Sequence, residues 1–488
     1  MILEILNHTY QYEALKLAQI FYPNDKIEVV TQESPNTNND VVLSTLFDEN
    51  DVIVSFKSDE LNIKKSKNRK AMADEELIMT TLMFDILKDV TNYTPQWGVL
   101  TGIRPSKLLR TLQNEMGEEK ALKYFTDNFF VTKEKTNLTK SVAMAEEKII
   151  KLSKPMSFSL YVSIPFCPTR CSYCSFVSHS MTSKTAKDLV PEYVKLLCEE
   201  IRHTGKIAKE LNLHLESIYF GGGTPTTLEA SELTQLINAI SESFDLSDLL
   251  EYTVEAGRPD TITEEKLLAL KKGNVTRISI NPQSFNDDVL KEIGRNHSAD
   301  LAVEKFRLAR KMGFNNINMD LIAGLPRDNL ASFKNSLLQT SELNPENITV
   351  HTLALKRSSN LGRNKVAVET EKSDIASKML SFTYETLINK NYFPYYMYRQ
   401  SRTIGNLENT GYSKKGFEGV YNIFMMEECH TVLAVGAGAV TKLKEPNTKY
   451  IERIFNFKYP YEYIRDFSEI INRKSVIIPF YDRSNNEK

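Results

Sequence analysis

The sequence is poor in cysteine and tryptophan. It has five cysteines and one tryptophan among 488 residues. So sparse and odd a set of cysteines argues against a secreted disulfide framework, and we expect a reducing, cytoplasmic location. The amino-terminal residues also lack a basic segment followed by an apolar core, which argues against a secretory signal peptide.

Long apolar runs and an excess of one charge are absent too. No apolar stretch has the length of a transmembrane helix, so we expect no membrane span. Lysine and arginine number 61 against 63 aspartates and glutamates, a net charge of −2. A chain without an overall basic field is not expected to bind nucleic acid. Its length allows two or three domains with a sizeable core.

Three of the five cysteines lie within eight residues. Cys167, Cys171 and Cys174 form a C-x3-C-x2-C run directly after a strand-like segment. Structural zinc sites have four ligands, commonly as two C-x2-C pairs, and the sequence has no second pair. Three thiolates can instead hold three irons of a [4Fe–4S] cluster and leave the fourth iron open for a small molecule. We interpret the run as the ligands of such a cluster.

The other two cysteines have no ligand-spaced neighbours. Cys198 falls in a helix-like stretch beside leucines, which is typical of an inert buried thiol. Cys429 is adjacent to His430, so a ligand role stays open there, although a structural role is the commoner one. The glycine-rich stretch Val432–Val440 could let a backbone approach a ligand or form a tight turn.

The apolar pattern divides the chain into three parts. Residues 1–150 combine short strand-like runs with helix-like stretches, which predicts a separate α+β domain. Within it Arg104, Lys107 and Arg110 form a row that could meet an anionic substrate, although a solvated helix face is the commoner explanation. Residues 381–488 are irregular and rich in aromatics, and we expect a mixed carboxyl-terminal extension there.

Residues 156–380 alternate strand-like runs with segments of helical periodicity. Six such runs occur, at Leu160–Pro165, Ser217–Phe220, Tyr252–Glu255, Arg277–Asn281, Ile317–Ala323 and Ile348–Leu355. Repeated βα units form parallel strands with right-handed crossovers. Six units predict an α/β fold with an open, partial (β/α)6 barrel.

Polar residues follow the predicted strands at the ends where ligands bind in βα folds. Gly221–Pro225 follows the second strand, and its glycines would let backbone groups approach a ligand. Glu255 ends the third strand, Gln283 the fourth, and Asp320 interrupts the fifth. Each alone could be structural, but three at successive strands indicate one ligand. Arg295 adds a planar guanidinium suited to a carboxylate.

The cysteine spacing resembles that of the radical S-adenosylmethionine (SAM) enzymes. In these enzymes SAM binds the open iron, and an electron from the cluster cleaves it to a 5′-deoxyadenosyl radical. Longer segments resemble the oxygen-independent coproporphyrinogen III oxidase family, in its branch of HemZ-type coproporphyrinogen dehydrogenases. These segments are Leu160–Cys167, Gly221–Thr226, Arg277–Ser284 and Asp320–Pro326.

The resemblance implies contacts with SAM position by position. Tyr161 would lie beside the cluster, and Tyr173 would contact the adenine by its backbone. The methionine end of SAM would be lined by Gly222, Gly223 and Thr224. Its polar groups would be bound by Glu255, Gln283, Arg295 and Asp320. Its adenosine would lie against Ala354.

The resemblance also implies oxidative decarboxylation of coproporphyrinogen III, in which propionates become vinyl groups during haem biosynthesis. An electron donor such as flavodoxin or ferredoxin would be needed, and we expect a monomer. The four substrate carboxylates would need cationic partners. Candidates by position are Arg170, Arg258 and Arg295, with Arg104 or Arg110 from the amino-terminal domain.

Two positions depart from the well-studied oxidases of the family. Ser163 replaces a histidine, and Phe176 replaces a fourth cysteine, although neither change removes a cluster ligand. A related branch that delivers haem also has phenylalanine at the second position. That branch carries an H-N-x-x-Y-W motif in its carboxyl-terminal part, whereas the one tryptophan here is Trp97. A haem chaperone and a radical methyltransferase acting on a tetrapyrrole stay as alternatives.

Overall fold

The chain folds into two compact units. In the computed structural model, which describes residues 1–32, 41–71, 74–176, 178–363, 370–446 and 448–486, each unit is built from separate stretches of sequence. The first unit comprises Met1–Ala143, Val366–Ser377 and Met397–Glu408; the second comprises Met144–Lys365, Lys378–Tyr396 and Asn409–Lys488. No helix in the described ranges combines the length and apolar character that crossing a bilayer requires.

A five-stranded sheet forms the base of the first unit. Its strands, in the order β2-β1-β3-β4-β5, are Glu28–Val30, Ile2–Leu6, Val42–Phe47, Asp51–Lys57 and Asn62–Asn68. Helices α1 (Gln11–Phe21) and α2 (Glu75–Thr91) share one apolar core with the sheet. Strand β5 is rich in lysine, and its mostly exposed lysines protect the sheet edge from pairing with other chains.

Buried polar contacts complete the first unit beside helices α3 (Pro105–Met116), α4 (Glu118–Asp127) and the start of α5 (Lys133–Ile150). Lys135 Nζ lies 2.7 Å from Glu408 Oε1, and both side chains are almost fully buried. The indole of Trp97 donates to the other oxygen of Glu408 at 2.8 Å. A buried ion pair is costly unless hydrogen bonds satisfy it, as they do here. Because Glu408 is a member of the pair, these contacts hold the late segment 397–408 in this unit.

The second unit contains the predicted α/β barrel. Six parallel strands are neighbours in chain order, and each overlaps a predicted run: β6 (Ser157–Ile164), β9 (His214–Gly222), β10 (Glu251–Glu255), β11 (Arg277–Ser279), β12 (Ile317–Ala323) and β13 (Asn347–Thr352). Among the described strands, no pairing joins the two ends of the sheet, so the barrel is open. The prediction of a partial barrel is confirmed.

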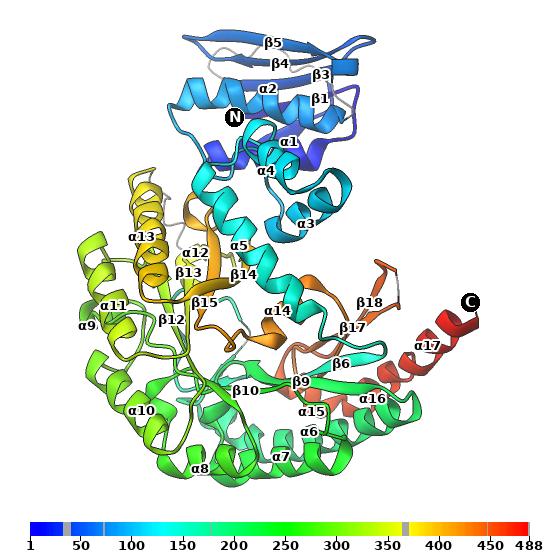
Figure 1. Cartoon of the computed structure of the whole chain (residues 1–488), viewed down its shortest axis with the longest axis vertical. Helices are drawn as coiled ribbons and strands as arrows, with labels where there is room; N and C mark the ends of the chain where they lie inside the picture. The colour runs from blue at the N-terminus through cyan, green and yellow to red at the C-terminus, as the bar shows by residue number, and fades with distance from the viewer. Residues whose placement is uncertain (33–40, 72–73, 177, 364–369, 447, 487–488) are drawn as a thin grey trace. The chain divides into compact units, whose positions relative to one another are not determined.

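Helices connect the parallel strands and cover the outer face of the sheet (Figure 1). They are α6 (Lys184–Glu210), α7 (Ala230–Ser243), α8 (Glu264–Lys272), α9 (Asp287–Glu292), α10 (Ala299–Lys311) and α11 (Leu330–Glu342). Capping side chains set several of their starts: Thr263, Ser298 and Asn329 each accept a hydrogen bond from a backbone N–H of the first turn. Such caps satisfy donors that the helix itself leaves unpaired.

The late part of the chain extends the same sheet on both sides. At one side stand β14 (Phe393–Arg399) and β15 (Glu408–Ser413), and at the other β16 (Thr431–Val435), β17 (Val440–Lys444) and β18 (Ile451–Phe455). Because β16 runs parallel to β6 and is fully buried, it forms a seventh parallel strand. The remaining helices are α12 (Asn360–Arg363), α13 (Thr370–Asn389), α14 (Val420–Glu427), α15 (Pro460–Arg465), α16 (Phe467–Lys474) and α17 (Ile477–Asn486).

The glycine-rich stretch forms the tight turn between β16 and β17. Gly436 and Gly438 both have positive φ angles, +94° and +73°. A side chain at Gly436 would start 2.6 Å from the carbonyl oxygen of Ser163, which leaves room only for glycine. Ser163 itself donates to Ala437 O at 2.7 Å. The turn alternative is confirmed, and the close approach is to the chain's own backbone.

Candidate functional site

The three clustered cysteines lie in the loop after the first barrel strand. Cys167 ends the short strand β7 (Phe166–Cys167), which pairs with β8 (His179–Ser180). Cys171 is buried, whereas Cys167 and Cys174 are partly exposed. The amide of Cys174 donates to Cys171 O at 3.2 Å, so the last two cysteines share one turn.

Loops from three other strand ends hold this cysteine loop in place. After β9, Thr224 N donates to Phe166 O at 2.7 Å. Beyond β11, Ile293 O accepts from Ser172 N at 3.0 Å, and beyond β13, Leu361 N donates to Ser172 O at 3.0 Å. The cysteine loop therefore lies at the carboxyl ends of the parallel strands, where βα folds bind ligands.

The three thiols fit an iron–sulfur cluster better than a single metal ion. Burial raises the pKa of Cys174 to about 11, and the charges of the other two cysteines add to the increase, so the thiols are near one another. A tetrahedral zinc ion would bring its thiolates to within about 3.8 Å of one another. In the described part of the chain, no three Cys, His, Asp or Glu side chains are placed to hold one metal ion. A cluster accepts wider spacing because each thiolate binds a different iron.

Arg258 supplies positive charge beside this loop. Its buried guanidinium donates to both oxygens of Asp260 at 3.0 Å and lies 3.6 Å from Cys171 Sγ. The same nitrogen that faces the sulfur also donates to Thr169 Oγ1 at 3.2 Å. These contacts engage all three nitrogens of the group but not all five of its N–H donors, and its contact with a substrate carboxylate stays a prediction.

The glycine triplet joins the cysteine loop to the barrel interior. A side chain at Gly223 would start 2.5 Å from Phe166 O and 3.0 Å from Cys167 Sγ. Gly222 has a φ of +103°, and Thr224 Oγ1 lies 3.5 Å from Cys167 Sγ. Glycine is therefore required here because the cysteine loop approaches closely, a reason that the sequence did not reveal.

The interior of the barrel carries a row of polar and aromatic side chains. Alternate residues of a strand share one face of the sheet, and contacts connect this face from strand to strand. The Tyr219 hydroxyl of β9 donates a short hydrogen bond to Glu255 of β10. On the next strands, His351 Nε2 lies 3.6 Å from Asp320 Oδ2. Glu255 and Asp320 therefore belong to one polar group, as their strand positions predicted.

Burial shifts the ionisation of this group. It raises the pKa of Glu255 to about 7, and the nearby charge of Asp320 adds to the increase. Burial alone would lower the pKa of His351, but the contact with Asp320 raises it above its ordinary value. At neutral pH the group therefore holds exchangeable protons, a frequent feature of functional sites.

Asp320 and Gln283 are positioned by neighbouring polar groups. Asn318 Nδ2 donates to Asp320 Oδ1 and to Ser279 Oγ, both at 2.7 Å. Gln283 has a φ of +69°, which non-glycine residues rarely adopt, and two backbone hydrogen bonds to β12 hold it there. One of them runs from Gln283 N to Asp320 O at 2.9 Å.

Arg295 contacts Tyr173 of the cysteine loop. The guanidinium of Arg295 donates to Asn281 O at 2.7 Å and to the Tyr173 hydroxyl at 2.9 Å. Its Nε is buried and has no hydrogen-bond partner in the described part of the chain. An orphaned buried donor of this kind fits an anionic group of a bound cofactor.

The structure also shows where two further predicted SAM-binding residues lie, but their contacts do not indicate a ligand. Tyr161 of β6 stacks at 6.3 Å on both Tyr219 and Tyr421. Ala354 follows the end of β13 and is partly exposed at the mouth of the barrel. Arg104, Lys107 and Arg110 belong to the first unit, at the start of α3.

Sequence reasoning missed Tyr219, His351 and Tyr421 as members of this site. Tyr219 and His351 occupy inward positions of β9 and β13, so strand parity could have found them. Tyr421 is on α14, which lies on the inner face of the sheet (Figure 1), and it stacks on Tyr219 at 4.4 Å. Buried Glu251 accepts from Val420 N and Tyr421 N at 2.9 and 3.2 Å and so fixes the start of that helix.

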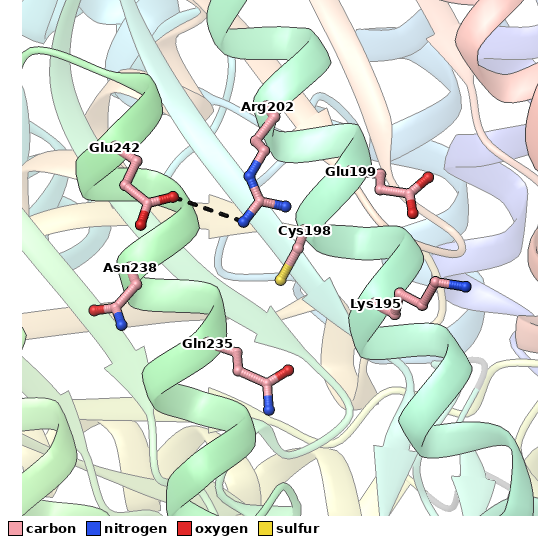
Figure 2. A pocket seen from close by; sticks show the side chains of 7 residues that line it. All are labelled: Lys195, Cys198, Glu199, Arg202, Gln235, Asn238 and Glu242. Atoms are coloured by element: carbon pink, nitrogen blue, oxygen red, sulfur yellow. Dashed lines mark ion pairs between the residues drawn. The ribbon is translucent and has the colours of Figure 1, made fainter.

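Neither of the other two cysteines lies in the cysteine loop, and their structural role stays a prediction. Cys198 is buried on α6 and lines a shallow groove toward α7, where Arg202 pairs with Glu242 at 3.6 Å (Figure 2). Cys429 Sγ donates to Phe424 O at 3.7 Å. His430, the open metal-ligand candidate, is buried between Ser153, Ser159 and Glu216.

Comparisons with known proteins agree with this site. Residues 161–339 match the model of the radical SAM superfamily. The oxygen-independent coproporphyrinogen-III oxidase-like protein HemZ of Bacillus subtilis is 39% identical, over 83% of this chain and 81% of its own length. The haem chaperone HemW of the same organism is 31% identical, over 65% of this chain and 80% of its own length.

A solved structure shows the same fold. The Escherichia coli coproporphyrinogen III oxidase HemN, a radical SAM enzyme, superimposes with a TM-score of 0.52 and 22% identity, covering 67% of this chain and 72% of its own. Radical SAM proteins use a [4Fe–4S] cluster and SAM, and these are the cofactors of this chain. The chain belongs to the radical SAM superfamily, in the family of HemZ-like oxygen-independent coproporphyrinogen-III oxidase-like proteins.

Proposed function

We propose that this protein is a radical SAM oxidoreductase that converts propionates of coproporphyrinogen III to vinyl groups. One observation carries the proposal, in a chain 39% identical to HemZ. The cysteine loop contacts Gly223, and Gly221 of the same triplet lies against Tyr161 and Tyr219, whose hydroxyl reaches Glu255. The cysteine loop therefore adjoins a half-buried acidic group at one edge of the parallel sheet.

Different residues of this chain would bind the cluster and SAM. Cys167, Cys171 and Cys174 would hold the cluster, which, together with SAM, supplies a carbon radical able to abstract hydrogen. The SAM contacts would come from Tyr161, Tyr173, Gly222, Gly223, Thr224, Glu255, Gln283, Arg295, Asp320 and Ala354. Glu255 and Asp320 suit cationic or hydroxyl groups, and the unpaired Nε of Arg295 suits a carboxylate.

In the substrate reaction, each converted propionate loses one carbon as CO2. A hydrogen atom leaves the β-carbon, the bond to the carboxylate carbon breaks, and CO2 departs. One electron passes to a one-electron acceptor, and a vinyl group remains. Two such steps would give protoporphyrinogen IX. The aromatic row of Tyr161, Tyr219 and Tyr421 would exclude water from the barrel interior.

The two departures from the studied oxidases have different structural settings. Ser163 is buried, and its hydroxyl donates to Ala437 O, so it braces the β16–β17 turn. Phe176 is 66% exposed in the cysteine loop. Neither change removes one of the three clustered cysteines, so the test must measure the product itself.

Anaerobic incubation with SAM, a reductant and coproporphyrinogen III tests the proposal. Mass spectrometry should show loss of CO2 from one or two propionates together with 5′-deoxyadenosine. Formation of 5′-deoxyadenosine without any vinyl product would contradict the proposed substrate but leave the radical chemistry intact. A methylated tetrapyrrole would instead identify a methyltransferase.

Haem binding is the second candidate because HemW is 31% identical over most of its length. A haem-binding protein would form a stoichiometric complex with haem and would not turn over coproporphyrinogen. Absorption titration with haem separates the two candidates, since an oxidase of a porphyrinogen need not bind the iron complex tightly. Saturation at one haem per chain, with no vinyl product, would favour the chaperone.

A further inference from the structure

The cysteine loop and the loop after β13 contain no acidic residue. The sequence has no Asp or Glu between Glu147 and Asp188, a stretch that includes the whole cysteine loop. It has none between Glu346 and Glu369 either, a stretch that includes the end of β13 and the loop after it. Elsewhere the chain has nearly equal numbers of acidic and basic residues, so this depletion is local.

These two stretches touch each other beside the cysteines. Arg170 Nη2 donates to Ser358 O at 3.0 Å, and Ser358 Oγ donates to Ser175 O at 3.3 Å. Ser172 O accepts from Leu361 N at 3.0 Å. Residues 170–176 and 356–363 therefore form one continuous surface, which we name the basic rim.

The basic rim presents cations and one exposed aromatic ring. Arg170, Arg357 and Arg363 are exposed, and Phe176 is 66% exposed. No ion pair joins Arg357 or Arg363 to an acidic group in the described ranges of the chain. The acidic group known to lie near the loop, Asp260, is already paired with buried Arg258. The rim thus keeps its positive charge and an apolar centre.

We infer that the basic rim is the docking surface of the electron donor, a small acidic protein that carries single electrons. This inference rests on the proposed assignment of the three cysteines to the cluster. Charge complementarity steers an acidic partner to the rim, and Phe176, two residues after Cys174, gives the interface an apolar anchor. The reduced donor loses one electron, the oxidised cluster gains it, and no bond between heavy atoms forms or breaks.

The basic rim suits this partner better than it suits the tetrapyrrole. Its arginines are exposed, whereas Glu255, Asp320 and His351 are half-buried on the inner face of the sheet. A protein donor needs an exposed surface close to the cluster. A substrate from which the radical abstracts hydrogen must instead reach the interior.

The double variant Arg357→Glu, Arg363→Glu reverses two charges of the basic rim and tests the docking surface. We expect SAM cleavage driven by a reduced, acidic flavodoxin to fall about tenfold at low salt, because two attractive charges become repulsive. Cleavage driven by dithionite should stay within about twofold of the original protein. Calorimetric titration with oxidised flavodoxin, which needs no turnover, should show about tenfold weaker binding.

Lys272→Glu, Lys311→Glu is the matched control. Both lysines are exposed near helix ends that lead into the amino ends of strands, away from the cysteine loop, and the change in net charge is the same. The control should leave both rates and the binding unchanged. Equal flavodoxin-driven rates in the rim variant and the control would overturn the inference, and so would an equal loss with dithionite. Absence of iron and sulfide from the unmodified protein would instead overturn the cysteine assignment.

Discussion

Two glutamates of the same sheet, one buried and one half-buried, show how position decides the role of a residue. Glu216, near the start of β9, accepts from Ser157 Oγ at 2.5 Å and Lys154 N at 2.9 Å and lies 3.5 Å from His430. Glu255, at the end of β10, has the Tyr219 hydroxyl as its hydrogen-bond donor and Asp320 as a nearby charge.

The two environments shift the pKa in opposite directions. Burial raises the pKa of both carboxyl groups, but His430, Ser157 and a backbone N–H outweigh it at Glu216 and bring that pKa below the ordinary value. At Glu255 burial prevails, and the pKa is about 7. Both centres contain a glutamate, a histidine and hydroxyl groups, so composition does not distinguish them. The donors do: Glu216 accepts hydrogen bonds from Ser157 Oγ and Lys154 N at one oxygen, whereas Glu255 accepts from the Tyr219 hydroxyl.

The largest effect should come from removing a cluster ligand. Cys171→Ala leaves two thiolates of the proposed site, so we expect no detectable SAM cleavage and loss of the iron–sulfur absorption band. Cys198→Ala is the control, because this buried cysteine lies between α6 and α7 and should leave cleavage unchanged. Undiminished 5′-deoxyadenosine formation by Cys171→Ala under reducing conditions would refute the cluster assignment.

The paired variants Glu255→Gln and Glu216→Gln test the contrast directly. Glu255→Gln keeps the size of the side chain and removes its charge, and we expect SAM cleavage to fall about 100-fold with little change in unfolding free energy. Glu216→Gln removes the buried carboxylate that accepts from Ser157 Oγ and Lys154 N and should cost about 3 kcal/mol of stability while the cleavage rate of the folded protein persists. Chemical denaturation and anaerobic kinetics measure both. The reverse pattern would show that the roles are exchanged.

The pH dependence of stability should have opposite signs at the two glutamates. A raised pKa means that Glu255 favours folding below pH about 4.5 and that this contribution is lost as the pH rises toward 7. We expect a loss of about 2 kcal/mol, allowing for partial exposure. Glu216, with its lowered pKa, favours folding above pH about 4.5 and loses that contribution as the pH falls.

Urea unfolding of the apoprotein between pH 4 and pH 8 measures this difference. Glu255→Gln should flatten the neutral side of the profile, and Glu216→Gln the acidic side. A Glu255→Gln profile that falls toward pH 7 as steeply as that of the original protein would show that this carboxyl does not titrate there.

The smallest effect should come from the Tyr421 hydroxyl. Tyr421 is 5% exposed and stacks on Tyr219, and no hydrogen bond of its hydroxyl is found within the described residues. Tyr421→Phe should change the free energy of unfolding by less than about 0.5 kcal/mol, whereas Tyr421→Ala should cost about 4 kcal/mol through the cavity it leaves. Equal costs for the two variants would indicate a hidden partner of the hydroxyl.

Much of the barrel and its edge could be predicted from sequence. The six strands are local apolar runs, and their carboxyl ends must meet at one edge, so Glu255, Gln283 and Asp320 could be assigned to a common site. The cysteine run is likewise local. The three-part division into residues 1–150, 156–380 and 381–488 stays a prediction, and the observed units interleave stretches from both halves of the chain.

The sequence by itself determined the ligand chemistry and the parallel strands, because both depend on spacing within short segments. Only the tertiary structure decided which polar groups are already satisfied. Gly223 proved to serve the cysteine loop, Arg258 to pair with Asp260, and β16 to become a seventh parallel strand. These outcomes depend on contacts between residues far apart in the chain, and neither periodicity nor motif spacing contains that information.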